Sequence, residues 1–549
     1  MASFTPPQAA PTWTHSADDV LRLTKEAIAN DTTALDKVAA LKPEDCNFET
    51  ASLQTAIDAA VEPLSFYQNV SPSKELRDAS NEAEVLVRDY GVDASMRLDV
   101  FQAKLAAEKN IKASGQKLDA EEQRLVDKML LDGKRAGLAL PEAQRDELMK
   151  LKKELSQASL EFSKNFNEEN STVTFTLEQL KGVPADVTSG YTKRADGGKE
   201  VYDVTMKTPD IFPIFRTAEN PETRRLASEA YDRRLEINAP LLDKMLGLRR
   251  KIASILGYPT WADYITEFLD DLEQKLRPIG ARERVTLLAL KQEEHAAKGY
   301  PFDGELYMSD FWYYSRRLLE RELELDDQKV KEHFPVNKVV PAILEIYQQL
   351  LGVQFVEVKS ETLWHPDVQQ FAVWENGAKD ESGFVGYCYL DLFPREAKYS
   401  HAAVWPLLPG YTRRDGKRSY PLAAMVANLA KPTPTTPALM QHSDVVTFFH
   451  EMGHVFHGLL SKTRFARFHG TAVARDFVEA PSQMLENCRY VNVGLYYLRQ
   501  VFFAKFDIKV HTDKEATDYT ALWNDLREAI TTVKFKQRAA GQGSFNHIA

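Results

Sequence analysis

The 549-residue sequence lacks the features that mark secreted, membrane-spanning or disordered proteins. Its three cysteines, Cys46, Cys388 and Cys488, lie far apart and form no CxxC pair, which argues against a disulfide framework and against a cysteine zinc site. No stretch reaches the ~18 uncharged apolar residues that a membrane-spanning helix needs. With only 25 glycines and 26 prolines, the composition is typical of a folded protein.

Excess positive charge and targeting signals are also missing. Lysine and arginine number 69 against 80 acidic residues, and the formal net charge of -11 disfavours a protein that coats nucleic acid or binds anionic membranes. The N-terminal segment has neither the basic and apolar parts of a secretory signal nor the arginines of a transit peptide. We therefore expect a cytosolic protein with no nucleic-acid or membrane partner.

Helical periodicity dominates the sequence. Apolar residues recur at three- and four-residue spacing from about Ala17 to Phe166, and again from Asn220 to about Leu351. Two short segments have the alternating, β-branched pattern of strands instead. The first, at 171–208, contains the turn signal Asp-Gly-Gly, and the second, at 368–391, is predicted to form a hairpin.

These patterns predict a mainly α fold with small β elements. We divide it into an N-terminal helical region at 1–170, a short β-containing connection at 171–210 and a large C-terminal region at 211–549. The Pro- and Thr-rich stretch at 431–437 is expected to be a loop that precedes another helix.

The most informative feature is a cluster of histidines. Six of the 12 histidines lie between His401 and His469, three of them within FHEMGHVFHG. His450 and His454 are four residues apart, so on a helix both rings project from one face and can bind the same metal ion. Glu451 borders that face, which completes the HExxH arrangement of zinc peptidases. For the motif alone, a buried helix with incidental histidines remains the alternative.

A helix is the expected setting for this motif. Ser443 or Asp444 can cap its start, and Gly458 marks a plausible end. An apolar stripe would bury the helix against a core, and its members are Val445, Phe448, Met452, Val455 and Leu459.

Catalytic zinc takes three protein ligands and leaves one position open, so a third donor is needed. Glu479 follows His454 after 24 intervening residues, enough for one helix to end and a second to present a carboxylate. Taken alone, Glu479 is better explained as a surface or helix-terminal residue. His457, one turn beyond His454, could also face the metal, but we expect it to support the site or to pack, and Asp476 and Glu486 are candidates to orient a ligand imidazole from outside the metal shell.

The segments HEMGHVFHGLL and GTAVARDFVEAPSQMLEN closely resemble the thimet oligopeptidase, neurolysin and saccharolysin family of zinc oligopeptidases. The likeness extends upstream through GYCYLDLFPREAKYSHAA and covers most of the chain. It implies a two-lobed, zincin-type helical body with a deep central channel that admits only short peptides. Residue by residue, it implies one zinc ion held by His450, His454 and Glu479, with Glu451 as the general base.

The sequence also departs from the family pattern. His547 matches a histidine that the family uses to bind substrate, but the tyrosine-bearing continuation is missing after it. The resemblance makes 211–549 the catalytic metallopeptidase region, and its C-terminal part is expected to be incomplete. Two internal stretches, near 262–278 and 485–500, are also expected to be shorter than in relatives. Tyr496 and Tyr497 are expected in the core and not as replacements for the missing tyrosines.

Together these observations predict a zinc-dependent metalloendopeptidase that hydrolyses internal bonds of short peptides. The alternative is a form that binds zinc and peptide but is catalytically impaired by the missing segments, because a lost oxyanion donor typically costs about 10²- to 10³-fold in rate. The hairpin at 368–391 is a candidate sheet edge for the peptide, with a purely structural role as the alternative.

Overall fold

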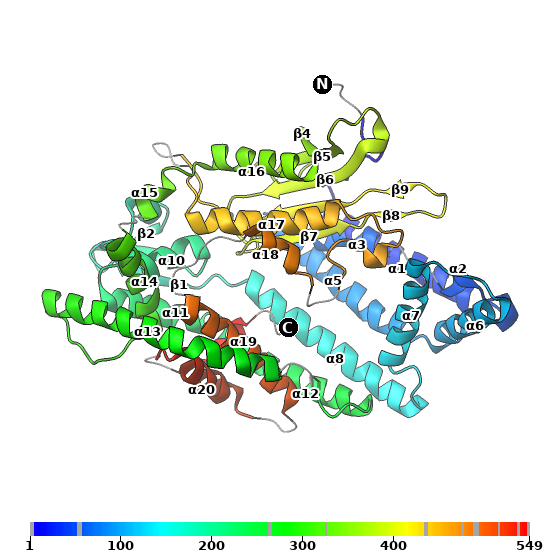
Figure 1. The fold of residues 1–549 in the computed structure, drawn as a ribbon, viewed down its shortest axis with the longest axis horizontal. Helices are drawn as coiled ribbons and strands as arrows, with labels where there is room; N and C mark the ends of the chain where they lie inside the picture. The colour runs from blue at the N-terminus through cyan, green and yellow to red at the C-terminus, as the bar shows by residue number, and fades with distance from the viewer. Residues whose placement is uncertain are drawn as a thin grey trace. The chain divides into compact units, whose positions relative to one another are not determined.

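The computed structural model describes residues 5–51, 57–261, 266–323, 327–432, 437–473, 477–486, 493–513, 517–534 and 538–545. Most of these residues lie in helices and few lie in strands (Figure 1), which confirms the mainly α fold. The chain forms two compact units. The first comprises Met1–Ser156, Phe334–Lys431 and Ala438–Asn487, and the second comprises Gln157–His333, Pro432–Pro437 and Cys488–Ala549. The region boundaries expected near 170 and 210 remain predictions.

The N-terminal part is helical, as its periodicity predicts. Ser16 and Asp119 each accept the backbone N–H three residues on, so both form capping boxes that start long helices. The eight helices are α1 (Ala17–Ala39), α2 (Phe48–Ala51), α3 (Ile57–Ser65), α4 (Tyr67–Val70), α5 (Lys74–Ser95), α6 (Leu98–Ser114), α7 (Ala120–Arg135) and α8 (Glu142–Asn167).

A five-stranded mixed sheet forms the centre of the first unit, in the order β4-β5-β6-β10-β7. Its strands are β4 (Val353–Glu357), β5 (Gln369–Glu375), β6 (Phe384–Asp391), β7 (Ala403–Leu408) and β10 (Leu422–Val426). The predicted hairpin is confirmed, since β5 and β6 pair antiparallel. Its candidate role as a sheet edge is wrong, because β5 also pairs with β4 and β6 also pairs with β10, which leaves the purely structural alternative. The edge strands are β4 and β7.

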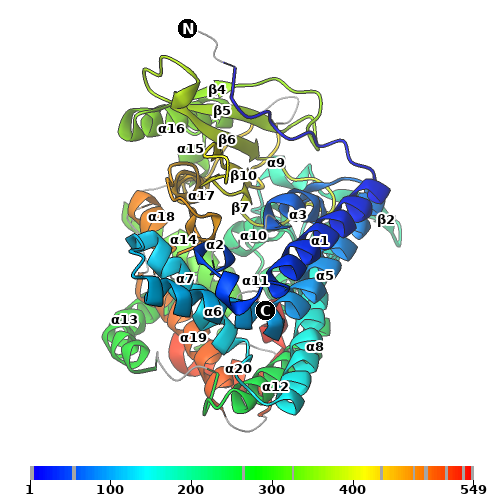
Figure 2. The same ribbon diagram turned by 90° about the vertical axis from the view of Figure 1, so that its right-hand side faces the viewer.

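Both faces of this sheet are covered. Alternating side chains of β6 serve two separate cores, Cys388 and Leu390 on one face and Tyr387 and Tyr389 on the other. Two helices, α16 (Val336–Leu351) and α17 (His442–Leu459), pack on the first face, and the N-terminal segment with α1 and α3 packs on the second (Figure 2). β6 is therefore buried along its whole length.

A buried ionic cluster lies at the end of β6. Asp391 accepts hydrogen bonds from Arg395 at 2.6 Å and Lys398 at 2.8 Å, and the indole of Trp364 donates to it at 2.8 Å. Burial lowers the pKa of Lys398 to about 8, and the adjacent carboxylate opposes that shift. The cluster fixes the chain between β6 and β7, because Lys398 also donates to three backbone carbonyls.

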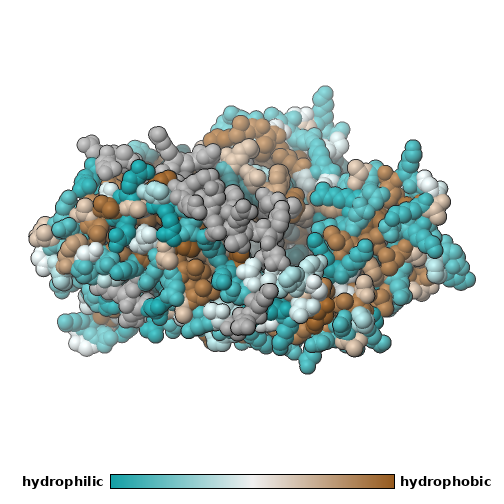
Figure 3. Space-filling model, turned by 60° about the horizontal axis from the view of Figure 1, so that its bottom comes forward, coloured by the Kyte–Doolittle hydropathy of each residue, from teal (hydrophilic) through white to brown (hydrophobic). Residues whose placement is uncertain are grey.

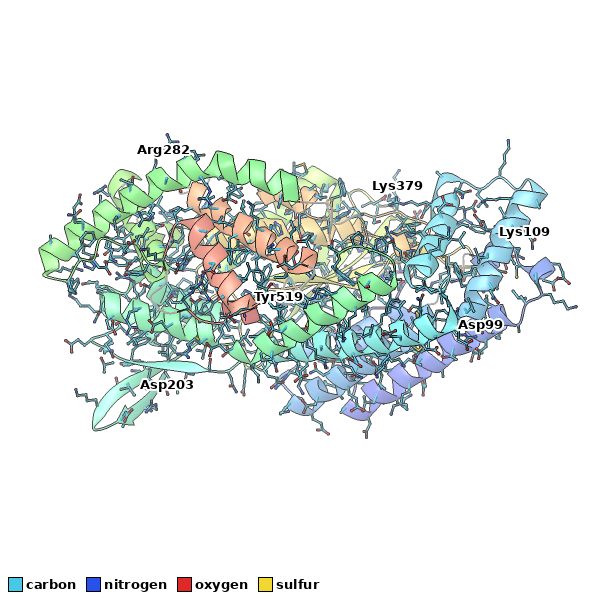
Figure 4. All side chains as sticks on the ribbon, turned by 90° about the horizontal axis from the view of Figure 1, so that it is seen from below. Asp99, Lys109, Asp203, Arg282, Lys379 and Tyr519 are labelled. Atoms are coloured by element: carbon cyan, nitrogen blue, oxygen red, sulfur yellow. The ribbon has the colours of Figure 1, made fainter. Side chains whose placement is uncertain are left out.

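The second unit is largely helical and includes a small sheet of order β1-β3-β2. The predicted turn at Asp196-Gly197-Gly198 joins β3 to β2, a strand that the alternating pattern does not predict, and Gly197 and Gly198 adopt φ of 54° and 80° there. Asp203, labelled in Figure 4, accepts a hydrogen bond from Arg194 across this hairpin. The strands are β1 (Thr172–Thr176), β2 (Thr192–Asp196) and β3 (Lys199–Thr205).

Helices make up the rest of this unit, and α19 packs against α13 and α20. Tyr497 of α19 is 40% exposed, so the expectation that it lies in the core is wrong. The side chain of Tyr496 lies outside the described residues. The helices are α9 (Ala185–Thr188), α10 (Thr208–Thr217), α11 (Pro221–Arg233), α12 (Ala239–Ile255), α13 (Thr266–Lys298), α14 (Met308–Leu323), α15 (Asp327–Lys331), α19 (Val493–Thr512) and α20 (Tyr519–Thr531).

Within the described residues, no helix combines the length and the apolar character needed to cross a bilayer. On the face drawn in Figure 3, hydrophilic side chains lie among hydrophobic ones over most of the surface.

Candidate metal centre

Helix α17 carries the histidine cluster and packs firmly on the sheet. Four of the five residues of the predicted apolar stripe are buried, and Val445 packs against the same core. The helix begins at His442, with Gln441 as its N-cap, so the expectation that Ser443 or Asp444 would be the cap is wrong. Asp444 instead occupies the third helical position, where its carboxylate accepts the Gln441 N–H at 2.8 Å.

Three donor atoms converge beside α17. His450 Nε2 lies 3.3 Å from Glu479 Oε2, and His454 Nε2 lies 3.1 Å from the same oxygen. One donor atom from each of these residues lies within 4.8 Å of the other two, and no other such group occurs in the described part of the chain. Glu479 immediately precedes the short helix α18 (Ala480–Glu486), which follows α17 in the chain and packs against it.

The donor set fits zinc. Ligands placed about 2.0–2.2 Å from a tetrahedral ion lie roughly 3.3–3.6 Å apart, and the two separations observed here, 3.3 and 3.1 Å, lie at or just below that range. Two imidazoles and one carboxylate are also the ligand chemistry of a catalytic zinc site. Burial lowers the pKa of His454, which favours the neutral imidazole whose lone pair binds a metal.

Glu451 lies next to this centre on α17 and is only 8% exposed. Tyr399, in the segment between β6 and β7, is an electrostatic neighbour of Glu451. Burial raises the pKa of the Tyr399 phenol, and the Glu451 carboxylate adds to the shift. Because Glu451 is buried, its carboxylate is largely withdrawn from solvent.

Sequence reasoning missed Ser482, which is fully buried. Its hydroxyl donates to Glu479 Oε2 at 3.1 Å and to the Glu479 carbonyl at 2.9 Å. It thereby holds the oxygen that faces both histidines. The sequence does contain a signal for this contact. Pro481 suits the first turn of a helix, so Glu479 is expected just before that helix, and Ser482, three residues after Glu479, is expected beside it.

Of the other expected site residues, only His457 has a described side chain. The ring of His457 contacts that of Phe477, with centroids 6.2 Å apart, and His457 is not in the donor cluster. Its supporting role remains a prediction. Asp476 and His547 lie outside the described residues, as does the side chain of Glu486.

One helix that carries two histidines and an acid in the HExxH spacing, with a third ligand just before the next helix, is typical of the active site of metallopeptidases. The comparison with known families agrees, because the sequence pattern of peptidase family M3 matches residues 214–490. The chain belongs to peptidase family M3, which confirms the resemblance seen in its motifs, and it is a metalloprotease by class.

Two eukaryotic relatives and one bacterial relative are similar along most of the chain. Saccharolysin of Saccharomyces cerevisiae is 33% identical over 598 residues, which covers 99% of this chain and 84% of that protein. Thimet-like oligopeptidase of Dictyostelium discoideum is 34% identical, covering 88% and 79%. Oligopeptidase A of Escherichia coli is 25% identical, covering 84% and 75%. The yeast alignment is longer than the 549-residue chain, so saccharolysin has residues without a counterpart here.

Proposed function

We propose that this chain is a zinc-dependent endopeptidase that hydrolyses internal bonds of short peptides. His450, His454 and Glu479 would hold one zinc ion, and Glu451 would be the general base. The observation that carries the proposal is the convergence of three donor atoms around one point next to a buried carboxylate. The names of the relatives, all oligopeptidases or saccharolysin, support peptides as the substrate class.

The chemistry divides between the ion and the protein. Zinc, when bound, supplies a Lewis acid that polarises the scissile carbonyl and makes water a better nucleophile at neutral pH. Glu451 accepts the proton of the attacking water and passes it to the departing amine. Ser482 keeps the Glu479 oxygen directed at the two histidines, since its hydroxyl donates to that oxygen.

The sheet offers a place for the peptide backbone. Among the described strands, β7 pairs only with β10, so its other side is an edge, and α17 packs against β6, β10 and β7. We propose that an extended peptide adds to the β7 edge, which brings a bond of its backbone close to the α17 residues. The deep channel that the family resemblance implies stays a prediction.

Metal analysis and peptide hydrolysis test this function together. The purified chain should contain one zinc per molecule and should cleave a quenched fluorescent peptide until a chelator removes the metal. Glu451→Gln should keep the zinc and lose at least about a hundredfold in kcat, because general base catalysis is worth roughly 10²- to 10⁴-fold. Glu345→Gln, an exposed residue of α16, is the matched control and should keep full activity. Full turnover by Glu451→Gln would show that another group is the base.

The second candidate is a protein that binds zinc and peptide without hydrolysis, the form suggested by the segments that differ from the family. It predicts stoichiometric zinc and measurable peptide affinity, with the same background rate in the wild type and in Glu451→Gln.

A cytosolic location is likewise a proposal. It rests on the sparse cysteines, of which Cys46 and Cys388 are free thiols.

A further inference from the structure

The connection between α17 and α18 ends at Glu479, and one N-terminal helix accepts hydrogen bonds from its backbone. The N-terminal end of α7 lies beside residues 464–468 of this connection (Figure 1). Glu121, in the first turn of α7, accepts the backbone N–H groups of Arg464 and Phe465, each at 3.0 Å and both at Oε1. Two amides on one carboxylate oxygen fix the direction of the chain at that point, and hydrogen bonds to a charged acceptor are stronger than neutral ones.

Side chains reinforce this contact on the α7 side. Arg464 pairs with Glu122 at 2.6 Å and with Asp119 at 3.3 Å, and Arg467 pairs with Asp132. These pairs are partly exposed, so each contributes little on its own. Together, however, they lie along one helix, next to the two hydrogen bonds that the Glu121 carboxylate accepts from the backbone of the connection.

The opposite side of the connection is held as well. A small hairpin consists of β8 (Tyr411–Thr412) and β9 (Arg418–Ser419), and its residues donate hydrogen bonds to carbonyl groups of the connection. Arg418 reaches the carbonyls of Ser461 and Thr463 at 2.8 and 2.6 Å, and the Thr412 N–H donates to the Arg464 carbonyl at 3.0 Å. The backbone N–H of Arg464 therefore donates to α7, and the backbone C=O of the same residue accepts from the hairpin.

We propose that Glu121 is a positioning residue for the third zinc ligand. By fixing the connection at residues 464–465, it limits where the chain can present Glu479 to His450 and His454. The N-terminal helical region thereby contributes to the metal site. This inference rests on the proposed zinc site, and it concerns Glu121, a residue far from the HExxH motif in sequence.

Zinc affinity and amide exchange test the inference without relying on turnover. The variants are Glu121→Ala, which removes the acceptor, and Glu121→Gln, which keeps an oxygen but loses the charge. Asp127→Asn, another carboxylate of α7 that bonds Gln123 and not the connection, is the matched control. We expect Glu121→Ala to weaken zinc binding by about 3- to 30-fold in a chelator competition, the range of coupling carried through packed elements.

Glu121→Gln and the amide exchange rates distinguish a positioning role of Glu121 from a contact that only binds the connection. Zinc affinity should be partly restored in Glu121→Gln and unchanged in Asp127→Asn, and the amides of 464 and 465 should exchange faster in Glu121→Ala, with or without zinc. If these amides exchange faster while zinc affinity stays at the wild-type value, Glu121 binds the connection without positioning the ligand, and the inference is overturned. Unchanged exchange also overturns it. A wild-type chain that binds no zinc contradicts the proposed function instead, and the exchange experiment still reports on the Glu121 contact.

Discussion

Gly470 sits in the turn that leads from α17 toward Glu479, and an alanine there should be costly. Its φ is 58°, and a Cβ built on it would lie 2.9 Å from the Cα of Gly458, a backbone atom of α17. The left-handed conformation costs an L residue about 1–2 kcal/mol, and overpacking typically adds about 1–3 kcal/mol. We expect Gly470→Ala to lower the free energy of unfolding of the first unit by about 2–5 kcal/mol.

Two other alanine substitutions separate the two contributions. Gly416 has a φ of 79° with nothing within 4 Å of its built Cβ in the described structure, so Gly416→Ala should cost only the conformational part, about 1–2 kcal/mol. Gly458 has a similarly open position inside a helix, and Gly458→Ala should stabilise by about 0.5–1 kcal/mol. Two glycines that touch are thus expected to respond in opposite directions.

Denaturant unfolding of the zinc-free proteins measures these differences. The midpoint and slope should be fitted for the transition that each substitution moves, because a chain of two units need not unfold in one step. If Gly470→Ala destabilises the protein no more than Gly416→Ala does, the close contact with Gly458 carries no energetic cost and the reasoning is refuted.

Two further predictions concern buried charge in the first unit. His469 is 6% exposed, and burial, with Arg418 adding to it, lowers its pKa to about 4 from an ordinary value of 6.5. Protonation then penalises the folded state progressively as the pH falls from 6.5 to 4, so the wild type should lose about 3 kcal/mol more unfolding free energy between pH 7 and pH 4 than His469→Gln does. Equal losses in denaturant curves at the two pH values would contradict this. Asp391→Asn leaves Arg395 and Lys398 without their anion and should cost about 3–5 kcal/mol, with part recovered by adding Lys398→Met. A denaturation midpoint that matches the wild type would show that the cluster is already neutral.

The local features of the site follow from local sequence. The four-residue spacing of His450 and His454 places both rings on one side of α17, because the helical period is 3.6 residues. The buried stripe of α17 and the turn between β2 and β3 follow from the same kind of short-range pattern. The position of Ser482 next to Glu479 could also be predicted from local sequence, because Pro481 marks the first turn of the helix that follows Glu479.

The hairpin at 368–391 marks the limit of such patterns. Alternation and turn residues predict that β5 and β6 pair with each other, which they do. Whether they form an edge depends on β4 and β10, which join them from other parts of the chain. Strand pairing depends on contacts between distant parts of the chain, so the edge strands are β4 and β7, and the edge proposed for the peptide is β7 and not the predicted hairpin.

The amino-acid sequence determined the helices, the pair of histidines and the family, because each of these is written in residues close together in the chain. The tertiary structure decided that Glu479 reaches both histidines and that an N-terminal helix holds the connection leading to it. The hydrogen bond from Phe465 to Glu121 joins residues 344 positions apart. No periodicity spans that distance, because such a contact exists only after the separate parts of the first unit have packed together.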